Sequence, residues 1–249
     1  MAPVRGTRVS SPASAFALRL AAVCLGVSLV TAGCGRMNVG PGLSADRSTG
    51  FDDASAGSVP EGWQVTATNP TAATAKWQVA ADPTAPSGPK VLALTESKNY
   101  DGTYNLAIAK GTRYDDLEMA VRVKAVAGTE DQGGGPVWRY QDRNNYYIAR
   151  MNPLEGNMRL YVVHKGKRRQ LDHAAVTLSA DRWYEIKVRM MGRRIECFLD
   201  GQPLLQASDD TLPGAGKIAL WTKADAVTSF DDLVVWRTPA GPRAKEETR

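Results

Sequence analysis

"WYEIKVRMMGRRIECFLDGQPLL", residues 183–205, is the stretch that decides the fold. Apolar and polar residues alternate through the segments 183–190 and 194–200, which is typical of strands with one buried face. Residues 191–193, between these segments, are expected to form a tight hairpin turn. A second turn is expected at the Asp-Gly pair 200–201, because these residue types suit positive φ. The stretch therefore predicts short antiparallel strands joined by tight turns.

The rest of the range 50–237 carries the same kind of signal. No window shows a sustained apolar period of 3.6 residues, whereas short strand-like segments recur between turn residues. In the segment 117–124 every second residue is Leu, Met or Val. About a dozen such strands without helices predict an all-β, two-sheet antiparallel jelly-roll sandwich rather than a small barrel.

Three stretches carry a resemblance to known proteins. Residues 183–205 resemble the hairpin of laminin-G and concanavalin A-like domains, and "GKIALWTKADAVTSFDDLVV", 216–235, resembles the closing strands of that superfamily. "GGPVWRYQDRNNYYIARMNPLEGNMRLY", 134–161, resembles the 3-keto-disaccharide hydrolase-like family within it. The resemblance implies a concanavalin A-like jelly roll that handles carbohydrate. It does not by itself imply catalysis.

The N-terminal segment 1–33 has the composition of an export signal. Three arginines and no acidic residue accompany the apolar run 20–30, and small residues then lead to Cys34. The end of this segment resembles a bacterial lipobox, which implies cleavage before Cys34, lipidation of its sulfur and a membrane anchor. The residue after Cys34 is Gly35 and not the aspartate associated with inner-membrane retention, which favours the outer membrane where a cell has one. Plain secretion is one alternative. A spanning helix is the other, although it needs ~20 apolar residues.

The mature chain divides into three parts. Residues 34–49 are rich in Gly, Ser and polar residues and predict a flexible tether. The range 50–237 is long enough for one jelly-roll domain. The tail 238–249 begins with Pro and Gly and ends in charged residues, which predicts disorder.

Charge and cysteine content argue against nucleic-acid binding and against an intrachain disulfide. Removal of the three arginines of the signal lowers the formal charge from +5 to about +2, which gives no support to nucleic-acid binding. A short basic run is expected to be a solvated hairpin tip rather than a polyanion site; it comprises Lys165, Lys167, Arg168 and Arg169. After loss of Cys24 and lipidation of Cys34 only Cys197 remains, so no intrachain disulfide is expected and Cys197 is expected in the core.

The candidate binding surface lies in the segment 137–163. Alternation places Trp138 and Leu160 in the core. The strand 146–151 has two registers, and the one that turns Tyr147 inward and Arg150 outward is favoured, because an unpaired arginine is rarely buried.

Aromatic rings and planar hydrogen-bonding groups on a concave sheet suit a sugar, because rings stack on C–H faces while Arg, Asn and Glu bond hydroxyls. The expected partner is therefore a glycan. The expected glycan-binding residues are Arg139, Tyr146, Arg150, Asn152, Glu155, Asn157, Arg159 and Tyr161. The alternative is that tyrosines merely form strands and that polar residues decorate strand ends and a plain turn.

Catalysis would require two carboxylates, and the candidates are few. The Glu-x-Asp-x-x-Glu signature of laminarinase-type jelly rolls is absent from the sequence. Asp116 and Glu118 would share one face of a strand, and Glu155 would pair with Asp142 or Asp131. The sequence therefore favours a binding protein, with a glycoside hydrolase or lyase and a purely structural envelope lipoprotein as alternatives.

A structural calcium ion is the one cofactor that the resemblance implies. Concanavalin A-like domains often hold it where the first and last strands meet, which here corresponds to "FDDA", 51–54, and "FDDL", 230–233. Asp52 and Asp231 or Asp232 would supply the hard oxygen ligands that calcium prefers. The alternative is that these carboxylates simply end strands or turns.

Overall fold

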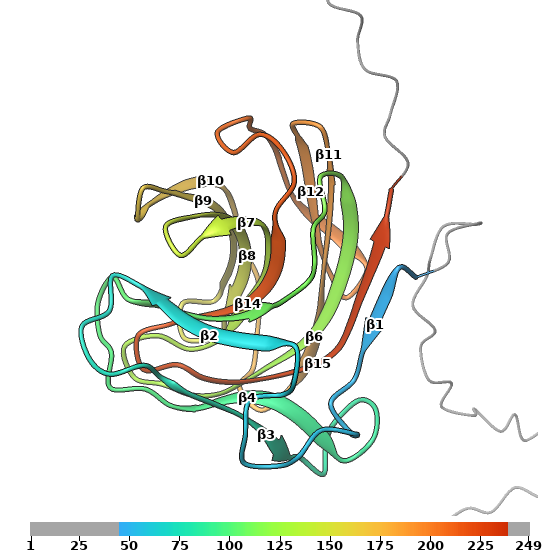
Figure 1. The fold of residues 1–249 in the computed structure, drawn as a ribbon. Coiled ribbons are helices and arrows are strands. Elements are labelled where there is room, and N and C mark those ends of the chain that lie inside the picture. Colours follow the sequence, from blue (N-terminus) through green and yellow to red (C-terminus); the bar gives the residue numbers. More distant parts are fainter. Residues whose placement is uncertain (1–44, 239–249) are drawn as a thin grey trace, which may run out of the picture. The chain divides into compact units, whose positions relative to one another are not determined.

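Antiparallel strands make up all the regular structure that is described. The computed structural model describes residues 45–238, in which fifteen strands and no helix form two sheets packed as a sandwich (Figure 1). The search for a helix that could cross a membrane found none within these residues. The expected all-β, two-sheet antiparallel jelly-roll sandwich is confirmed. The predicted signal segment 1–33, Cys34 and the tail beyond residue 238 lie outside the described residues.

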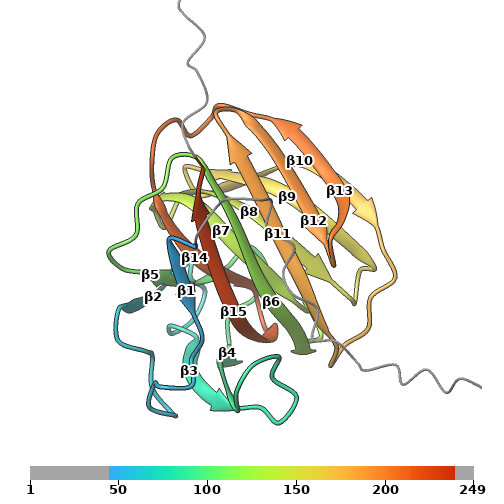
Figure 2. The same ribbon diagram turned by 90° about the vertical axis from the view of Figure 1, so that its right-hand side faces the viewer.

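The first sheet has eight strands in the order β13-β12-β11-β6-β15-β4-β3, with β1 paired to β15 (Figure 2). The bounds of its strands are β1 Arg47–Thr49, β3 Lys76–Ala81, β4 Lys90–Glu96, β6 Leu117–Ala127, β11 Trp183–Met191, β12 Arg194–Leu199, β13 Gln202–Ser208 and β15 Val227–Arg237. Because β1 falls inside the range 34–49, the sheet begins before the boundary expected at residue 50.

The second sheet has seven strands in the order β10-β9-β8-β7-β14-β5-β2. Their bounds are β2 Trp63–Thr68, β5 Tyr104–Ala109, β7 Gly134–Asp142, β8 Asn145–Asn152, β9 Asn157–His164, β10 Lys167–Ala175 and β14 Lys217–Lys223. Its edge strand β10 lies beside β13, the edge of the other sheet (Figure 2).

The stretch 183–205 forms the elements that its pattern predicts. Strands β11 and β12 pair from Ile186 opposite Leu199 to Met191 opposite Arg194, which leaves Gly192 and Arg193 as the turn. Gly192 has a φ of 58°, a conformation that glycine adopts at little cost.

The core between the sheets holds the side chains that alternation places inside. Trp138, Tyr147 and Leu160 are fully buried there. The rings of Trp138 and Tyr147 stack at 5.7 Å, and the indole N–H of Trp138 points to the sulfur of Met190 in the other sheet. The favoured register of β8 is therefore confirmed, but the expectation behind it, that Arg150 avoids burial, is wrong: Arg150 is buried on the opposite face. Cys197 is also buried, and its burial raises the pKa of the thiol far above the usual range.

A second apolar cluster covers the opposite face of the seven-stranded sheet. It includes Tyr146 and Trp221, both fully buried, although they point away from the main core. The sheet curls until β2 approaches the β7–β8 hairpin, where the Thr68 hydroxyl bonds both the Tyr146 hydroxyl, at 2.9 Å, and the Arg143 carbonyl. The centre of the curled face is therefore packed, and only its edge is exposed to solvent.

Candidate functional site

Three arginines converge on Tyr161 on the curled face. The Arg168 guanidinium lies over the Tyr161 ring, 4.3 Å from its centroid, and that of Arg150 lies 6.0 Å away. The third, Arg159, donates to the Tyr161 hydroxyl at 3.3 Å. We call Arg150, Arg159 and Arg168 the arginine cluster. Its members come from β8, β9 and β10, three neighbouring strands whose alternating residues share this face.

Glu155 joins two members of the arginine cluster. It lies in the β8–β9 turn, where its backbone N–H donates to the Asn152 side chain at 3.1 Å. One carboxylate oxygen accepts bonds from Arg150 at 2.8 Å and Asn157 at 3.1 Å, and it lies 3.2 Å from Arg159. Burial raises the pKa of Glu155, but these donors and the two positive charges outweigh it and lower the pKa to about 2. Glu155 is therefore a fixed anion at neutral pH.

Asp131 is the second carboxylate of this region. Its side chain is buried, lies 3.2 Å from the Lys223 ammonium and accepts a bond from Asn152 at 3.1 Å. Burial raises the pKa of Asp131, and the positive charges of Arg150 and Lys223 oppose that rise only in part. Asn152 thus bonds to both Asp131 and Glu155, whose pKa values are shifted in opposite directions.

Exposure separates the eight expected glycan-binding residues into two groups. Tyr146 and Asn152 are 0% exposed and Arg150 is 1% exposed, so these side chains shape the site from beneath. Asn157 and Tyr161 are also buried.

At the surface, the side chains of Arg159 and Glu155 are 32% and 35% exposed. Arg168 is half-buried beside them, and Gln170 and His173 on the same strand are exposed. A ligand would therefore meet the β9–β10 side of the face.

Arg139 corrects the expectation that it lines the glycan-binding face. It adopts a φ of 46° at a register shift in β7, so the alternation that assigned its side is broken there. Its guanidinium is buried and donates to the backbone carbonyls of Asp115, Leu212 and Gly192 at 2.8–3.2 Å. Arg139 therefore ties loops together and is not placed to contact a sugar.

The carboxylates proposed from strand spacing do not converge. Glu118 pairs with Lys187 and Arg189 on the outer face of the eight-stranded sheet. Asp116 instead accepts bonds from the Gly192 backbone and from Arg139. Both carboxylates hold structural partners of their own.

Of the two proposed partners of Glu155, only Asp131 shares its network. Asp142 caps the β7–β8 turn through Asn144 and Asn145.

Arg168 is the site residue that sequence reasoning missed. The basic run that contains it was expected to be a solvated hairpin tip, and Lys165 and Lys167 are indeed exposed. The two-residue period of a strand puts Tyr161 and Val163 on one face of β9. Arg168 pairs with Val163, so its side chain lies on the same face as Tyr161.

The residues expected to hold calcium lie close to one loop. Asp231 accepts bonds from the Ser87 backbone and hydroxyl, and Asp52 accepts from the Lys90 backbone at 3.0 Å. One oxygen of the Asp231 carboxylate is buried with no partner, and burial raises its pKa to about 6. No three His, Cys, Asp or Glu side chains within residues 45–238 form a metal site by themselves. A calcium ion there would need backbone oxygens or water in addition, which its coordination chemistry accommodates.

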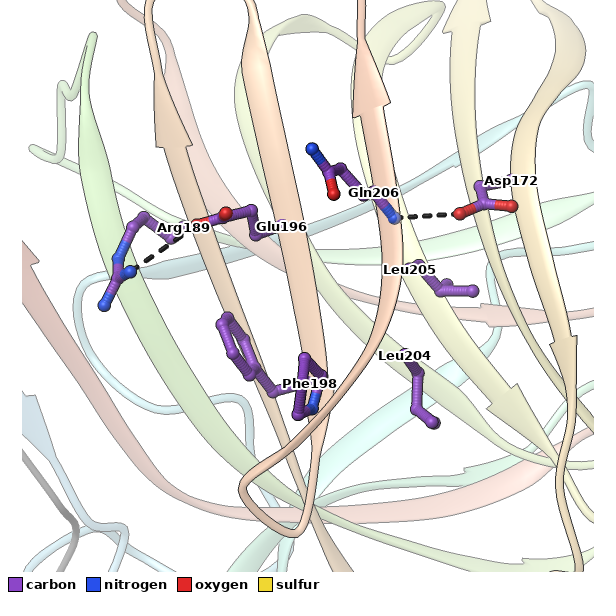
Figure 3. Close-up of a pocket in the computed structure, with 8 residues that line it drawn as sticks. Asp172, Arg189, Glu196, Phe198, Leu204, Leu205 and Gln206 are labelled. Carbon is purple, nitrogen blue, oxygen red and sulfur yellow. Dashed lines mark hydrogen bonds and ion pairs between the residues drawn. The ribbon is translucent and has the colours of Figure 1, made fainter.

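A hollow of about 460 Å³ lies on the eight-stranded sheet, beside Phe198 (Figure 3). Its charged groups are already paired: Arg189 with Glu196 at 3.5 Å, and Asp172 with the Gln206 backbone N–H at 2.8 Å. Lys187 lies 4.8 Å above the Phe198 ring. The hollow therefore offers a ligand fewer free groups than the arginine cluster does.

Comparison by sequence finds no relatives, whereas comparison by structure does. No protein-family model and no curated protein matches this sequence. The structure is similar to the carbohydrate binding module CBM66 from Bacillus subtilis, with a TM-score of 0.55 and 18% identity over 70% of this chain and 95% of that chain.

Two further structures are similar. Domain 4 of AbnA, a GH43 extracellular arabinanase from Geobacillus stearothermophilus solved in complex with arabinotriose, gives a TM-score of 0.53 and 12% identity, covering 80% of this chain and 94% of that chain. The β-glucanase of Bacillus licheniformis gives 0.52 and 10%, covering 79% and 99%.

The fold is a jelly-roll sandwich. At such identities the likeness establishes this fold alone, in agreement with the resemblance to concanavalin A-like domains. The narrower resemblance to the 3-keto-disaccharide hydrolase-like family stays a prediction based on the residues 134–161.

Proposed function

We propose that this chain is an exported, lipid-anchored carbohydrate-binding protein that holds a glycan against the arginine cluster. The observation that carries the proposal is the convergence of Arg150, Arg159 and Arg168 on Tyr161. Guanidinium groups fixed over an aromatic ring present planar donors, which suit pairs of sugar oxygens. A carbohydrate-binding module and a domain in complex with arabinotriose have a similar fold, which supports the proposal.

The surface around the cluster offers the other contacts that a sugar needs. Tyr140 is half-buried and stacks on the buried Tyr146 with 6.0 Å between ring centroids, so its position is fixed. Exposed edges of such rings pack against sugar C–H groups. Glu155 is an ionised acceptor for hydroxyl groups beside Arg159. Ring, acceptor and donors are therefore held before a ligand arrives, which lowers the entropic cost of binding.

A glycan panel followed by calorimetry tests the proposal. Wild type is expected to bind at least one glycan, and Arg159→Ala is expected to weaken that binding by about tenfold or more because it removes a charged donor. Arg143→Ala is the matched control, because Arg143 is exposed in the β7–β8 turn and its guanidinium forms no hydrogen bond or ion pair with the described residues. Silence of the wild type across a broad panel would contradict the proposal and favour a structural envelope lipoprotein.

The anchor is tested separately. Cys34→Ser is expected to move the chain from the membrane fraction to the soluble exported fraction, because it removes the sulfur that would carry the lipid. An unchanged membrane association would contradict lipidation at this position.

Glycoside cleavage is the second candidate function. Asp131, with a raised pKa, and Glu155, with a pKa lowered to about 2, are the kind of carboxylate pair that divides acid and base roles. The Asp131 side chain is only 2% exposed, which argues for a structural role. Turnover of a 3-keto-glucoside by wild type and its loss in Glu155→Gln would establish cleavage. No turnover in either protein would exclude that reaction.

A further inference from the structure

We propose that the glycan is acidic and that a sugar carboxylate binds at Arg168 and Arg159. This inference rests on the proposed function and names its ligand class. A carboxylate offers two coplanar oxygens that match the fork of N–H donors on a guanidinium group, which makes the pair stronger than a bond to a neutral hydroxyl.

Positive charge exceeds negative charge around Tyr161. The three guanidinium groups of the arginine cluster share a single carboxylate, Glu155, which contacts only Arg150 and Arg159. The nearby Asp131 is paired with Lys223. The low pKa of Glu155 reflects the same excess. Uncompensated cations beside a partly buried face attract anionic ligands more than neutral ones.

Arg168 is the cation left without an anion. Within residues 45–238 its guanidinium forms no ion pair and no hydrogen bond, whereas that of its neighbour Arg169, on the opposite face of β10, pairs with Asp209 at 2.7 Å. The Arg168 guanidinium also lies 5.2 Å from the centroid of Tyr104, so two tyrosine rings contact it. Cation–π contacts hold the group in place without using its in-plane N–H donors. The guanidinium therefore keeps donors without a partner, and those other than the buried Nη1 are open to an external acceptor.

Hydrogen-bond donors exceed acceptors throughout the cluster. Three of its nitrogen atoms are buried without a partner among the described residues: Arg150 Nε, Arg159 Nε and Arg168 Nη1. Unpaired buried donors of charged groups are costly and are rarely left so without a functional reason. A carboxylate bound at the exposed side of Arg159 and Arg168 would add acceptor oxygens to a cluster in which donors outnumber them.

Calorimetry on the full chain with matched acidic and neutral sugars tests the inference. The probes are oligomers of galacturonate, glucuronate and mannuronate, together with their carboxyl-reduced neutral forms. Wild type is expected to bind at least one uronate oligomer about tenfold or more tightly than its reduced form, with an affinity that falls as salt is raised. Arg168→Gln is expected to abolish this difference. Lys167→Gln removes the same charge from an exposed neighbouring position and is expected to preserve it.

The outcomes separate this inference from the proposed function. Equal affinity for acidic and reduced forms, or binding only to neutral glycans, would overturn the acidic ligand while leaving carbohydrate binding intact. Binding of a sulfated oligosaccharide that lacks uronate residues, but of no uronate oligomer, would overturn the carboxylate as the recognised group. Binding of no sugar at all would overturn both. A melting temperature of Arg168→Gln close to that of wild type would show that a lost preference is not a loss of fold.

Discussion

At the scale of single residues, Asp225 shows how a distant carboxylate shapes the candidate site. It lies between β14 and β15, and its two oxygens accept the backbone N–H groups of Thr129, Glu130 and Asp131 at 2.7–3.1 Å. These bonds fix the loop that delivers Asp131 to Lys223. Burial raises the pKa of Asp225, but the hydrogen bonds outweigh it and lower the pKa to about 2.

Asp225→Asn is expected to destabilise the fold at neutral pH by ~1–3 kcal/mol, the range for bonds to a charged acceptor. Because the folded pKa lies below the unfolded one, the contribution of Asp225 is complete above about pH 4 and falls as the pH drops toward 2. The difference between wild type and variant should therefore shrink over that interval. Denaturant unfolding at pH 7, 4 and 3 measures it. Glu96→Gln, at an exposed position, is the control, and a constant difference would contradict the assignment.

Residue-level prediction succeeded where the strands are regular. Alternation left two registers for β8, and the favoured one, with Tyr147 in the core and Arg150 on the opposite face, is right, although Arg150 is buried there in an ion pair with Glu155. It failed at Arg139, because a bulge with positive φ reverses the side of a residue and nothing in the local sequence marks it. It also misjudged Arg168, since proximity to Tyr104 in β5 arises only when the sheet curls.

At the scale of elements, the bulge in β7 turns the Arg139 side chain toward three connections of the chain and lets it bond all of them. The guanidinium reaches Asp115 before β6, Gly192 between β11 and β12, and Leu212 between β13 and β14. Three connections from separate parts of the chain thus end on one buried side chain. Removal of such a group leaves several carbonyl oxygens unpaired at once.

Arg139→Gln is therefore expected to lower the free energy of unfolding by ~3 kcal/mol, the cost typical of a broken buried network. Glycan affinity, measured where the variant is folded, should stay within about twofold of wild type, because the side chain lies away from the arginine cluster. The exposed Arg143→Gln should change neither quantity. A large loss of affinity at unchanged stability would restore Arg139 to the binding site.

Elements and their pairing were predictable to different degrees. The hairpin 183–199 followed from its own residues, because local alternation and a glycine turn specify it. The neighbours of β14 were not predictable, since β14 pairs with β5 and β7, strands more than 70 residues earlier in the chain. The second apolar cluster depends on those long-range pairs, so Tyr146 and Tyr161 were expected at an open surface and are instead packed.

At the scale of the whole molecule, the first and last strands meet beside a set of carboxylates. Strand β1 pairs with β15, and the segments that follow β1 and β3 approach Asp231. Burial and the nearby charges of Asp232 and Asp52 all raise the pKa of Asp231, and one of its oxygens has no partner. A hard cation would stabilise the unpaired buried oxygen of Asp231, with backbone oxygens or water completing its coordination.

We therefore expect calcium to raise the melting temperature of the wild-type chain, with EDTA reversing the change. Occupancy at about 100 times Kd contributes ~2.7 kcal/mol, and for a domain of this size that corresponds to a rise of about 5–10 °C. Asp231→Asn should abolish the response, since it removes the anionic ligand. Asp53→Asn, a neighbouring exposed carboxylate that bonds none of the described residues, should keep it. Thermal unfolding with calcium, magnesium or EDTA decides the matter, and a wild type indifferent to calcium would show that these carboxylates serve only the loop around Ser87.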